Sequence, residues 1–367
     1  MPIQAAFNLN PNEIFASIAN MIISQEVFAD NLGKHQTLVD KARVDGGLYG
    51  DKKLYYATDV LESHPWGADS EATNLLALDR PADPEVQDIT LDIFRQIRLT
   101  VDNYLSKRAW SNEGAFSSFQ SVMLGWMRET KRVYDGTLYN VFIGTTVATG
   151  AAQTVELDLA GARGNASTEE EANRLEVECL AQGIADLLVK MGDYNRDYND
   201  YGFLRSYADD SIKVIWNSKF VNKVRKVDLP TIFHKEGLVD KFSEEVLPAR
   251  YFGTVNAADV AAGNNDGSYR SVLEKDYTVD TVVTHVFPGD FIPAGAAIEA
   301  GEGYLEDAKI IAKVVVKLPP YMSAFEVGTS FFNPRSLTEN HYLTFGHNTL
   351  EYLKNYPFIT IKEKATL

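Results

Sequence analysis

The segment ITLDIFRQIRLTVDNYLSKRAW (residues 89–110) constrains the fold of this chain of 367 residues more than any other stretch. Polar residues alternate there with six apolar ones, all at odd positions: Ile89, Leu91, Ile93, Ile97, Leu99 and Val101. Strict alternation is typical of a β-strand with one covered face and one face in water. Roughly 13 residues extend about 43 Å, whereas ordinary strands have about 5–6 residues. The sequence therefore predicts an unusually long strand whose apolar face needs a partner.

A second strand is predicted upstream, over residues 54–60, where aromatic and β-branched residues follow the turn glycines Gly46, Gly47 and Gly50. Residues 61–84 separate the two strands, contain three prolines and show no periodicity, which indicates a loop. The two strands and this loop together predict an antiparallel arm with the loop at its tip.

A long helix is predicted directly after the arm, because the hydrophobic period changes from 2 to 3.6 beyond Trp110. Ser111 and Asn112 are both competent N-caps, and Gly144 marks the end. Roughly 31 residues of helix extend about 46 Å. The apolar stripe of this helix consists of Phe116, Phe119, Met123, Met127, Thr130, Tyr134, Leu138 and Val141.

The rest of the chain mixes helices and strands, so the predicted fold class is α+β. An apolar stripe predicts a helix over residues 12–30, and a capping box at Ser167 or Thr168 predicts another that ends at Gly192. Strands are predicted over residues 212–216, 309–318 and 356–362, two short strands within 144–165, and loops over 253–303. Asn217 or Ser218 is expected to cap a short helix after the first of these strands.

Composition narrows the class of protein. The chain is 45% hydrophobic and 23% charged, which is ordinary for a globular protein, and its formal net charge is −16. A surface this acidic repels nucleic acid and anionic lipid, and the basic run at residues 223–226 is read as a solvated helix face. A single cysteine, Cys179, excludes an internal disulfide and is expected to pack in the interior. Neither a signal peptide nor a membrane-spanning segment is expected from the sequence.

No motif predicts catalysis, a cofactor or a metal. The phosphate-loop, dinucleotide, nucleophile-elbow and zinc-protease patterns are all absent from the sequence. The nearest approach is DYNRDYNDYGFL (residues 193–204), whose Asp193, Asn195, Asp197 and Asn199 have the spacing of a calcium loop. The match fails beyond these positions, because tyrosine and leucine stand where the loop needs glycine and glutamate. A polar loop that closes a helix is the preferred interpretation.

The order of these elements resembles the major capsid protein of tailed bacteriophages, in the fold shared with encapsulins and herpesvirus capsid floors. GGLYGDKKLYYATDV and ITLDIFRQIRLTVDNYLSKRAW resemble the two strands of its extended E-loop. FSSFQSVMLGWMRETKRVYDGTLYNVF resembles the spine helix, and IKVIWNSKFVNKV resembles the axial-domain strand that ends in asparagine. SFFNPRSLTENHYLTFGHNTLEYLKNYPFITIK is similar to the C-terminal part of these proteins.

The resemblance implies five parts, namely an N-terminal arm with a helix (1–45), the E-loop (46–103), a peripheral domain with the spine helix (104–165), an axial domain (166–308, with loop-rich 253–303) and a return to the peripheral domain (309–367). The E-loop would lie across a neighbouring subunit. The residues expected to contact that subunit are Lys52, Lys53, Leu54, Tyr56, Ile89, Leu91, Ile93, Arg95, Ile97, Arg98, Leu99 and Val101.

The implied function is that of a structural, non-enzymatic head protein of the virion, assembled in the host bacterial cytoplasm. Its hexamers and pentamers would form an icosahedral shell around double-stranded DNA held without sequence-specific contacts. A separate scaffolding protein and a portal protein are the expected partners, and no isopeptide crosslink is assigned to Lys52 or Lys53. Two alternatives stay open at this point: an encapsulin-type nanocompartment shell, and a cytoplasmic carboxylate-dependent hydrolase using acidic residues near Asp193 to Asp200.

Overall fold

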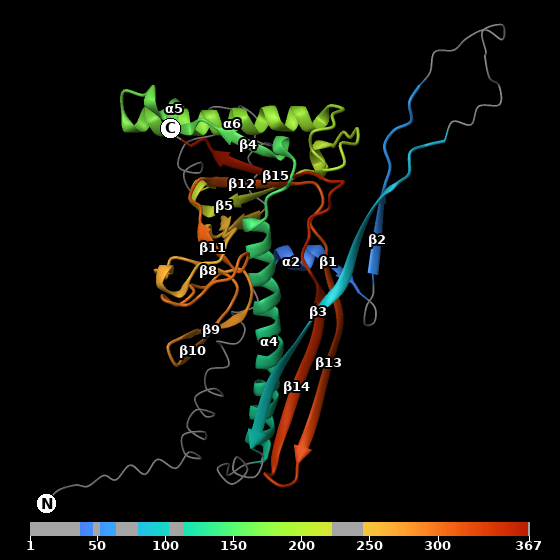
Figure 1. Ribbon diagram of the computed structural model, residues 1–367, viewed down its shortest axis with the longest axis vertical. Coiled ribbons are helices and arrows are strands. Elements are labelled where there is room, and N and C mark those ends of the chain that lie inside the picture. Colours follow the sequence, from blue (N-terminus) through green and yellow to red (C-terminus); the bar gives the residue numbers. More distant parts are fainter. Residues whose placement is uncertain (1–36, 47–51, 64–79, 103–112, 222–244, 366–367) are drawn as a thin grey trace, which may run out of the picture. The chain divides into compact units, whose positions relative to one another are not determined.

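The computed structural model describes residues 37–46, 52–63, 80–102, 113–221 and 245–365 (Figure 1). The helix predicted over residues 12–30 and the basic run 223–226 lie outside these residues. The chain divides into two compact units. Unit 1 comprises residues 1–51, 90–139 and 321–349, and unit 2 comprises 52–89, 140–320 and 350–367.

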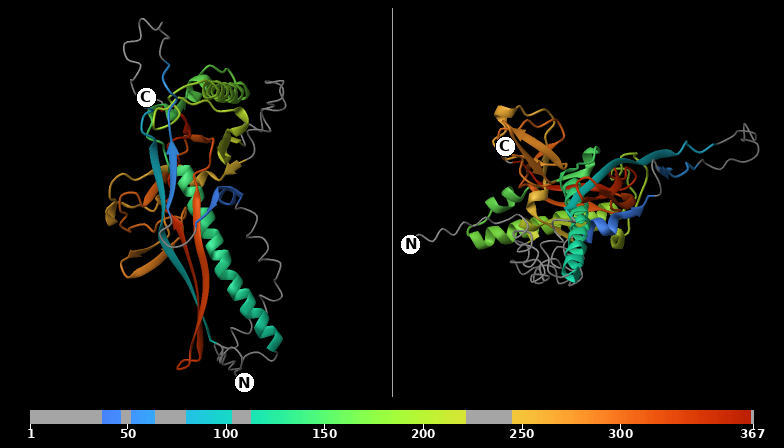
Figure 2. Two further views of the ribbon diagram at one scale, coloured as in Figure 1. Left: turned by 90° about the vertical axis from the view of Figure 1, so that its right-hand side faces the viewer. Right: turned by 90° about the horizontal axis from the view of Figure 1, so that it is seen from below.

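Unit 1 is built on long strands. Its short N-terminal elements are α2 (Thr37–Ala42) and β1 (Arg43–Asp45), and its long ones are β13 (Tyr321–Asn333), β14 (Thr338–Asn348) and most of β3 (Glu85–Asp102). They belong to one sheet in the order β1-β13-β14-β3-β2, where β2 is Lys52–Ala57 of unit 2. β14 pairs antiparallel with β13 on one side and with β3 on the other, and Figure 2 shows these long strands next to one another.

Helix α4 (Glu113–Thr145) begins in unit 1 and has 33 residues, which confirms the long helix predicted after the arm. Its residues Met127, Tyr134 and Leu138 are buried, as the predicted stripe requires, while Thr130 is partly exposed. Near the end of α4, within unit 2, a Cβ atom at Gly144 would lie 2.1 Å from the carbonyl oxygen of Tyr251. Only glycine permits this close approach.

The interior of unit 1 contains a cluster of buried polar side chains between α4 and the sheet. The buried carboxylate of Asp135 accepts hydrogen bonds from Arg43 Nη2 and Lys131 Nζ, both at 3.1 Å, and from the Tyr321 hydroxyl at 2.6 Å. His347, only 1% exposed, stacks on the ring of Tyr321 with centroids 5.5 Å apart. The buried carboxylate of Asp135 therefore has cationic partners, as a buried charge requires.

His347 is held in one tautomer by its two neighbours. Its Nδ1 lies 2.9 Å from the carbonyl oxygen of Asn348, which can only accept, so Nδ1 carries the proton. Its Nε2 then accepts from the Tyr134 hydroxyl at 2.7 Å. Burial lowers the pKa of His347.

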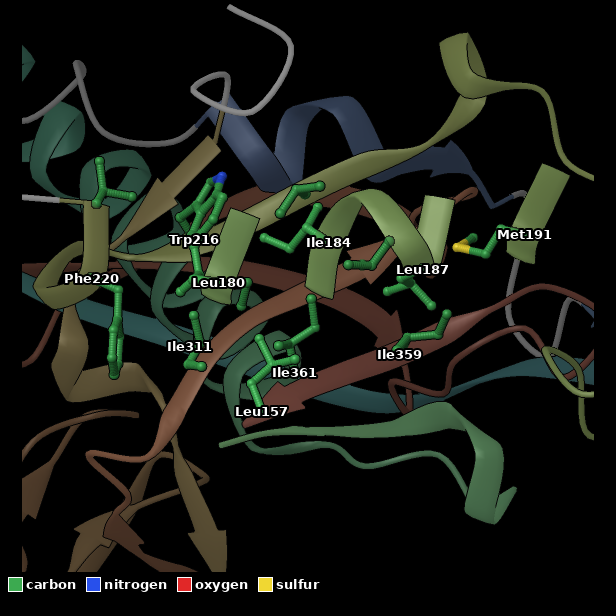
Figure 3. Packing of buried hydrophobic residues seen from close by; sticks show 14 of the residues in the cluster. Leu157, Leu180, Ile184, Leu187, Met191, Trp216, Phe220, Ile311, Ile359 and Ile361 are labelled. Atoms are coloured by element: carbon green, nitrogen blue, oxygen red, sulfur yellow. The ribbon is translucent and has the colours of Figure 1, made fainter. Parts of the chain in front are cut away.

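Unit 2 contains an extended apolar cluster. Its main sheet runs in the order β4-β15-β12-β5-β6, formed by β4 (Thr154–Leu157), β15 (Phe358–Glu363), β12 (Ile310–Val315), β5 (Lys213–Asn217) and β6 (Glu245–Leu247). The two outer pairings are parallel and the two inner ones antiparallel. Helix α6 (Glu169–Gly192) covers this sheet, and Figure 3 shows Leu180, Ile184 and Leu187 packed over it.

Local signals explain the ends of several elements. Thr168 caps α6, since its hydroxyl accepts from Glu171 N at 3.2 Å, while the Glu171 carboxylate accepts from Ser167 N at 2.9 Å. This confirms the capping box predicted from the sequence. Asn217 ends β5, and its Oδ1 accepts from Lys219 N at 3.1 Å, which confirms it as a helix cap.

Two regions differ from the prediction. Residues 144–165 hold one strand, β4, followed by a short helix, α5 (Leu159–Gly164), rather than two strands. The Asp158 carboxylate accepts from Gly161 N at 2.8 Å and so starts the helix among small residues that carry no periodic pattern.

The segment 253–303 is likewise more ordered than its composition suggests. It contains β7 (Gly253–Val255), β8 (Arg270–Ser271), β9 (Lys275–Val279) and β10 (Val282–Val286), and β11 (Gly303–Glu306) begins at its end. β7, β11 and β8 form one small sheet, and β9 pairs with β10 in a hairpin whose turn residue Asp280 has φ 53°. Strands of two to five residues are too short for alternation to reveal them.

Candidate assembly interface

The alternation along β3 is confirmed. At the two ends of the alternating segment the odd-numbered residues are buried, with Ile89 and Leu91 3% exposed and Val101 4% exposed. Ile93, Arg95, Ile97 and Leu99 between them are partly buried, whereas Arg98 and the other even-numbered residues from 90 to 100 are exposed. β3 also extends four residues further upstream than predicted.

In unit 1 the partner that the long strand needs is β14 of the same chain. Ile97 pairs with Leu343, Arg98 with Tyr342, and Leu99 with His341. The sequence analysis expected this length to serve a neighbouring subunit. Within the chain, β14 pairs with the edge of β3 from Leu91 to Asp102, and the contact with a neighbouring subunit stays a prediction.

The odd face of β3 in unit 1 is directed to α4. The Arg95 guanidinium lies 5.0 Å from the ring centroid of Tyr134 on α4, and that ring lies 5.8 Å from Phe345 on β14. Leu91 and Val101 therefore have little surface left for another molecule, and the same holds for Ile89 in unit 2. The predicted inter-subunit contact now depends on the other members of the predicted set.

The arm in unit 2, formed by β2 and the first residues of β3, has an exposed apolar face. Leu54 is 48% exposed, Tyr56 65%, and Val86 on β3 46%. Lys52 pairs with Asp88 at the same level, and this hydrogen bond and charge lower the pKa of Asp88. Lys53 is partly buried. Exposed apolar side chains gathered on a two-stranded ribbon are typical of an interaction surface.

The base of the arm is fixed where β2 ends. The carboxylate of Asp59 pairs with Arg196 Nη1 and also accepts from Leu204 N at 2.9 Å. The hydrogen bond from Arg196 is the main reason that the pKa of Asp59 falls to about 2. Arg205 adds a second attachment, because its Nη2 donates to the carbonyl oxygen of Thr58 at 2.6 Å.

The base is also fixed on the β3 side. Gln87 is 6% exposed. Its side-chain amide donates to Tyr352 O at 2.9 Å and accepts from Lys354 N at 3.0 Å, so it bonds to the backbone of residues 352–354 much as a neighbouring strand would. On β2, the ring of Tyr55 lies 5.6 Å from Lys317 Nζ. The arm therefore projects from a base held by directed hydrogen bonds on both of its strands.

The polar loop after α6 is used for structure. Asn199 donates to Phe203 O at 2.7 Å and accepts from Phe203 N at 2.8 Å. The carboxylate of Asp200 accepts from Gln153 Nε2 at 2.6 Å and from Thr149 Oγ1 at 3.0 Å. Among the described residues, no group of three or more His, Cys, Asp or Glu side chains could hold a metal ion. The polar loop that the sequence analysis preferred is thus what the structure shows.

A groove of about 620 Å³ lies within unit 1 between α4 and the β13–β14 hairpin. Its charged lining residues are Arg128, Glu326 and His341. Glu326 lies 3.5 Å from Lys131 Nζ, and His341 lies 3.9 Å from Glu339. The Glu326 carboxylate at this groove is therefore paired with Lys131. Within the described part of the chain, no helix is long and apolar enough to cross a membrane.

Sequence reasoning missed Val86, Asp59 and Gln87. Val86 is an even-numbered residue of β3, so it lies on the face opposite to the odd-numbered apolar residues. Its place in the exposed surface of the arm is apparent only when β2 is known to lie beside β3. Asp59 bonds to a residue more than 130 positions away, and Gln87 bonds to one more than 260 positions away. No local sequence pattern could therefore have identified either of them.

Comparison with known proteins identifies the fold. No protein-family model matches the chain, and no curated protein matches its sequence. Among solved structures, chains from phage capsids share its fold.

Two structures illustrate the similarity. The capsid structure of Staphylococcus phage Andhra matches with a TM-score of 0.56 at 11% sequence identity, over 88% of this chain and 83% of that one. A chain in the structure of the head fiber and inner core protein gp22 of native bacteriophage P68 matches with a TM-score of 0.57 at 10% identity, over 87% and 83%. The α+β capsid fold expected from the sequence is confirmed.

Proposed function

We propose that this chain is a major head protein that assembles with copies of itself into an icosahedral phage shell. The observation that carries the proposal is the arm, which has an exposed apolar face on a base fixed by Asp59 and Gln87. An interaction surface on a fixed base suits a repeated contact, because little conformational freedom is lost on binding. The fold shared with the Andhra capsid structure supports the same function.

The contact surface of the arm is proposed to be Leu54, Tyr56 and Val86, with Lys52 and Lys53 beside them. Burying such a side chain fully contributes roughly 1.5–3 kcal/mol, whereas association costs about 4–15 kcal/mol. One arm contact is thus weak and reversible, and closure of a symmetric shell multiplies it.

The further partners follow from the same proposal. A separate scaffolding protein would direct assembly in the host bacterial cytoplasm, a portal protein would occupy one vertex, and the finished virion would enclose double-stranded DNA. The net charge of −16 favours an interior that holds phosphate weakly. Tight, salt-sensitive binding of DNA by the purified chain would contradict this part. An encapsulin-type shell would share the fold but enclose protein cargo.

The experiment is expression of the full chain, alone and with a candidate scaffolding protein, followed by negative-stain electron microscopy. Shells, tubes or rings of capsomers are expected. The double variant Leu54→Asp and Tyr56→Asp should stay folded and lose particles, because both side chains are exposed.

The control is Val189→Asp on α6, which replaces a valine that is 74% exposed outside the arm. It should assemble like the original chain. Leu91→Asp is unsuitable for this test, since a residue 3% exposed would unfold the chain instead. Particles of normal size from the Leu54 and Tyr56 variant would remove the arm from the proposal, and a monodisperse monomer or dimer of the unmodified chain in both samples would overturn the proposed function.

A further inference from the structure

Lys313 lies at the centre of the main sheet of unit 2. It belongs to β12, the middle strand of the order β4-β15-β12-β5-β6, and it is 0% exposed. Its strand neighbours are Thr360 on β15 and Ile215 on β5, which are 2% and 0% exposed. A lysine so placed is unusual, because removing an ammonium group from water is costly unless a carboxylate compensates.

The hydrogen bonds of Lys313 fit a neutral amine. Its Nζ lies 2.8 Å from the carbonyl oxygen of Thr146 and 2.9 Å from Thr360 Oγ1. A neutral amine has two N–H groups, which these two acceptors satisfy. An ammonium has three, and among the described residues no third acceptor is found within hydrogen-bonding distance.

The charges that face Lys313 do not pair with it. The negative charge of Asp307 raises the pKa of Lys313, but the two residues form no ion pair. Glu245 on β6 shares its face of the sheet, since Lys313 pairs with Ile215 and Ile215 with Glu245. Glu245 is two strands away, about 10 Å by the usual spacing. The remaining contact is the ring of Phe358, whose centroid lies 5.8 Å from Nζ.

We propose that unit 2 holds Lys313 as a neutral amine, and that protonation of this amine is a built-in pH switch that loosens the central sheet. The inference stands on burial and hydrogen bonding and does not depend on the proposed shell function. It makes the chain less stable below neutral pH than above it.

The direction of the effect follows from proton linkage. Burial lowers the pKa of Lys313 to about 7, an effect that the charge of Asp307 only partly offsets, whereas lysine in an unfolded chain has a pKa of about 10.4. Between these two values the unfolded chain binds one more proton than the folded chain, so stability rises with pH. Lowering the pH from 9 to 6 should raise the unfolding equilibrium constant roughly a hundredfold through this residue alone.

The first test is urea unfolding of the full chain and of Lys313→Met between pH 6 and 9. Methionine keeps the length of the side chain and removes the proton. The unmodified chain should show a steeper rise of stability with pH than the variant, by up to about tenfold in the unfolding constant per pH unit. Comparing the two chains cancels the other titrating groups, among them Cys179, whose pKa burial raises.

The matched control is Lys362→Met. Lys362 lies on the adjacent strand β15, partly exposed, and pairs with Glu156 at 3.1 Å. This variant should keep the pH dependence of the unmodified chain. Equal slopes for Lys313→Met and the unmodified chain would overturn the proposal.

A second measurement needs no variant. In the unmodified chain labelled with ¹³C at the lysine Cε, one resonance should titrate near pH 7. If every lysine resonance titrates above pH 9, Lys313 is charged in the folded chain and the proposal fails.

Discussion

The two units differ in the side chains that they bury between a helix and a sheet. In unit 2 the face of the sheet under α6 is apolar, with Leu187, Ile359 and Ile361 no more than 3% exposed (Figure 3). In unit 1 the space between α4 and the strands holds Asp135, with its cationic partners, and His347. An apolar interior tolerates small changes of shape, whereas a polar one works only if each donor and acceptor is matched. The two interiors should therefore respond differently to substitution and to pH.

The largest effect is expected in unit 1, from Asp135→Ala. Removing the carboxylate leaves the buried Tyr321 hydroxyl without its acceptor, and it leaves the buried Lys131 ammonium with Glu326 at 3.5 Å as its remaining ion-pair partner. The free energy of unfolding should fall by about 3–5 kcal/mol, measured by chemical denaturation. Asp186→Ala, at an exposed position on α6, is the control and should change stability by less than about 0.5 kcal/mol. Equal small effects would show that the polar interior does not need its charge.

Leu187→Ala tests the apolar interior of unit 2 in the same way. Leu187 is 3% exposed within the cluster under α6. Truncation should cost about 3 kcal/mol through lost burial and a residual cavity. The neighbouring Leu188→Ala, which removes a partly buried side chain, should cost less. The comparison fails if Leu188→Ala proves the more damaging change.

A smaller, pH-dependent effect should distinguish the units at acid pH. Because burial lowers the pKa of His347 below its unfolded value near 6.5, the unfolded chain binds the extra proton first as the pH falls. Stability is therefore unaffected by this group above about pH 6.5 and falls below it, by at most about 1.4 kcal/mol per pH unit. Substituting His347→Gln should flatten this acid limb in a denaturation series, and His341→Gln should leave it in place.

The smallest effect lies outside both interiors. Thr168→Ala removes the side-chain cap of α6, which should cost about 1 kcal/mol. Thr168→Ser keeps the hydroxyl and should cost less. A loss above about 2 kcal/mol, read from the shift of the denaturation midpoint, would mean that Thr168 does more than cap the helix.

Elements with local signals were predictable from the sequence. Alternation identified β3, the helical period identified α4, and the capping box placed the start of α6 one residue after Thr168. What covers each face was not predictable, because the partners come from distant parts of the chain. Alternation along β3, for example, does not indicate that residues 338–348 pair with it as β14.

The residues predicted to contact another subunit differ in their exposure. Leu54 and Tyr56 are exposed as an interaction surface requires, whereas Ile89, Leu91 and Val101 are not. Alternation shows which side chains share a face and gives no account of what that face touches. The buried contacts of Asp135 and Lys313 were even less predictable, since each joins residues with no common sequence pattern.

The pairing of β3 with β14 has a consequence for synthesis of the chain. Thr349, just beyond β14, follows its contact Asp92 by 257 residues. At about 5–20 residues per second, the ribosome needs roughly 13–51 s to deliver the partner strand after β3 has emerged. Through that interval the edge of β3 lacks the strand that pairs with its backbone. Chaperone demand during translation should therefore be concentrated on this one strand, and nascent chains stalled before residue 338 should be the ones that aggregate.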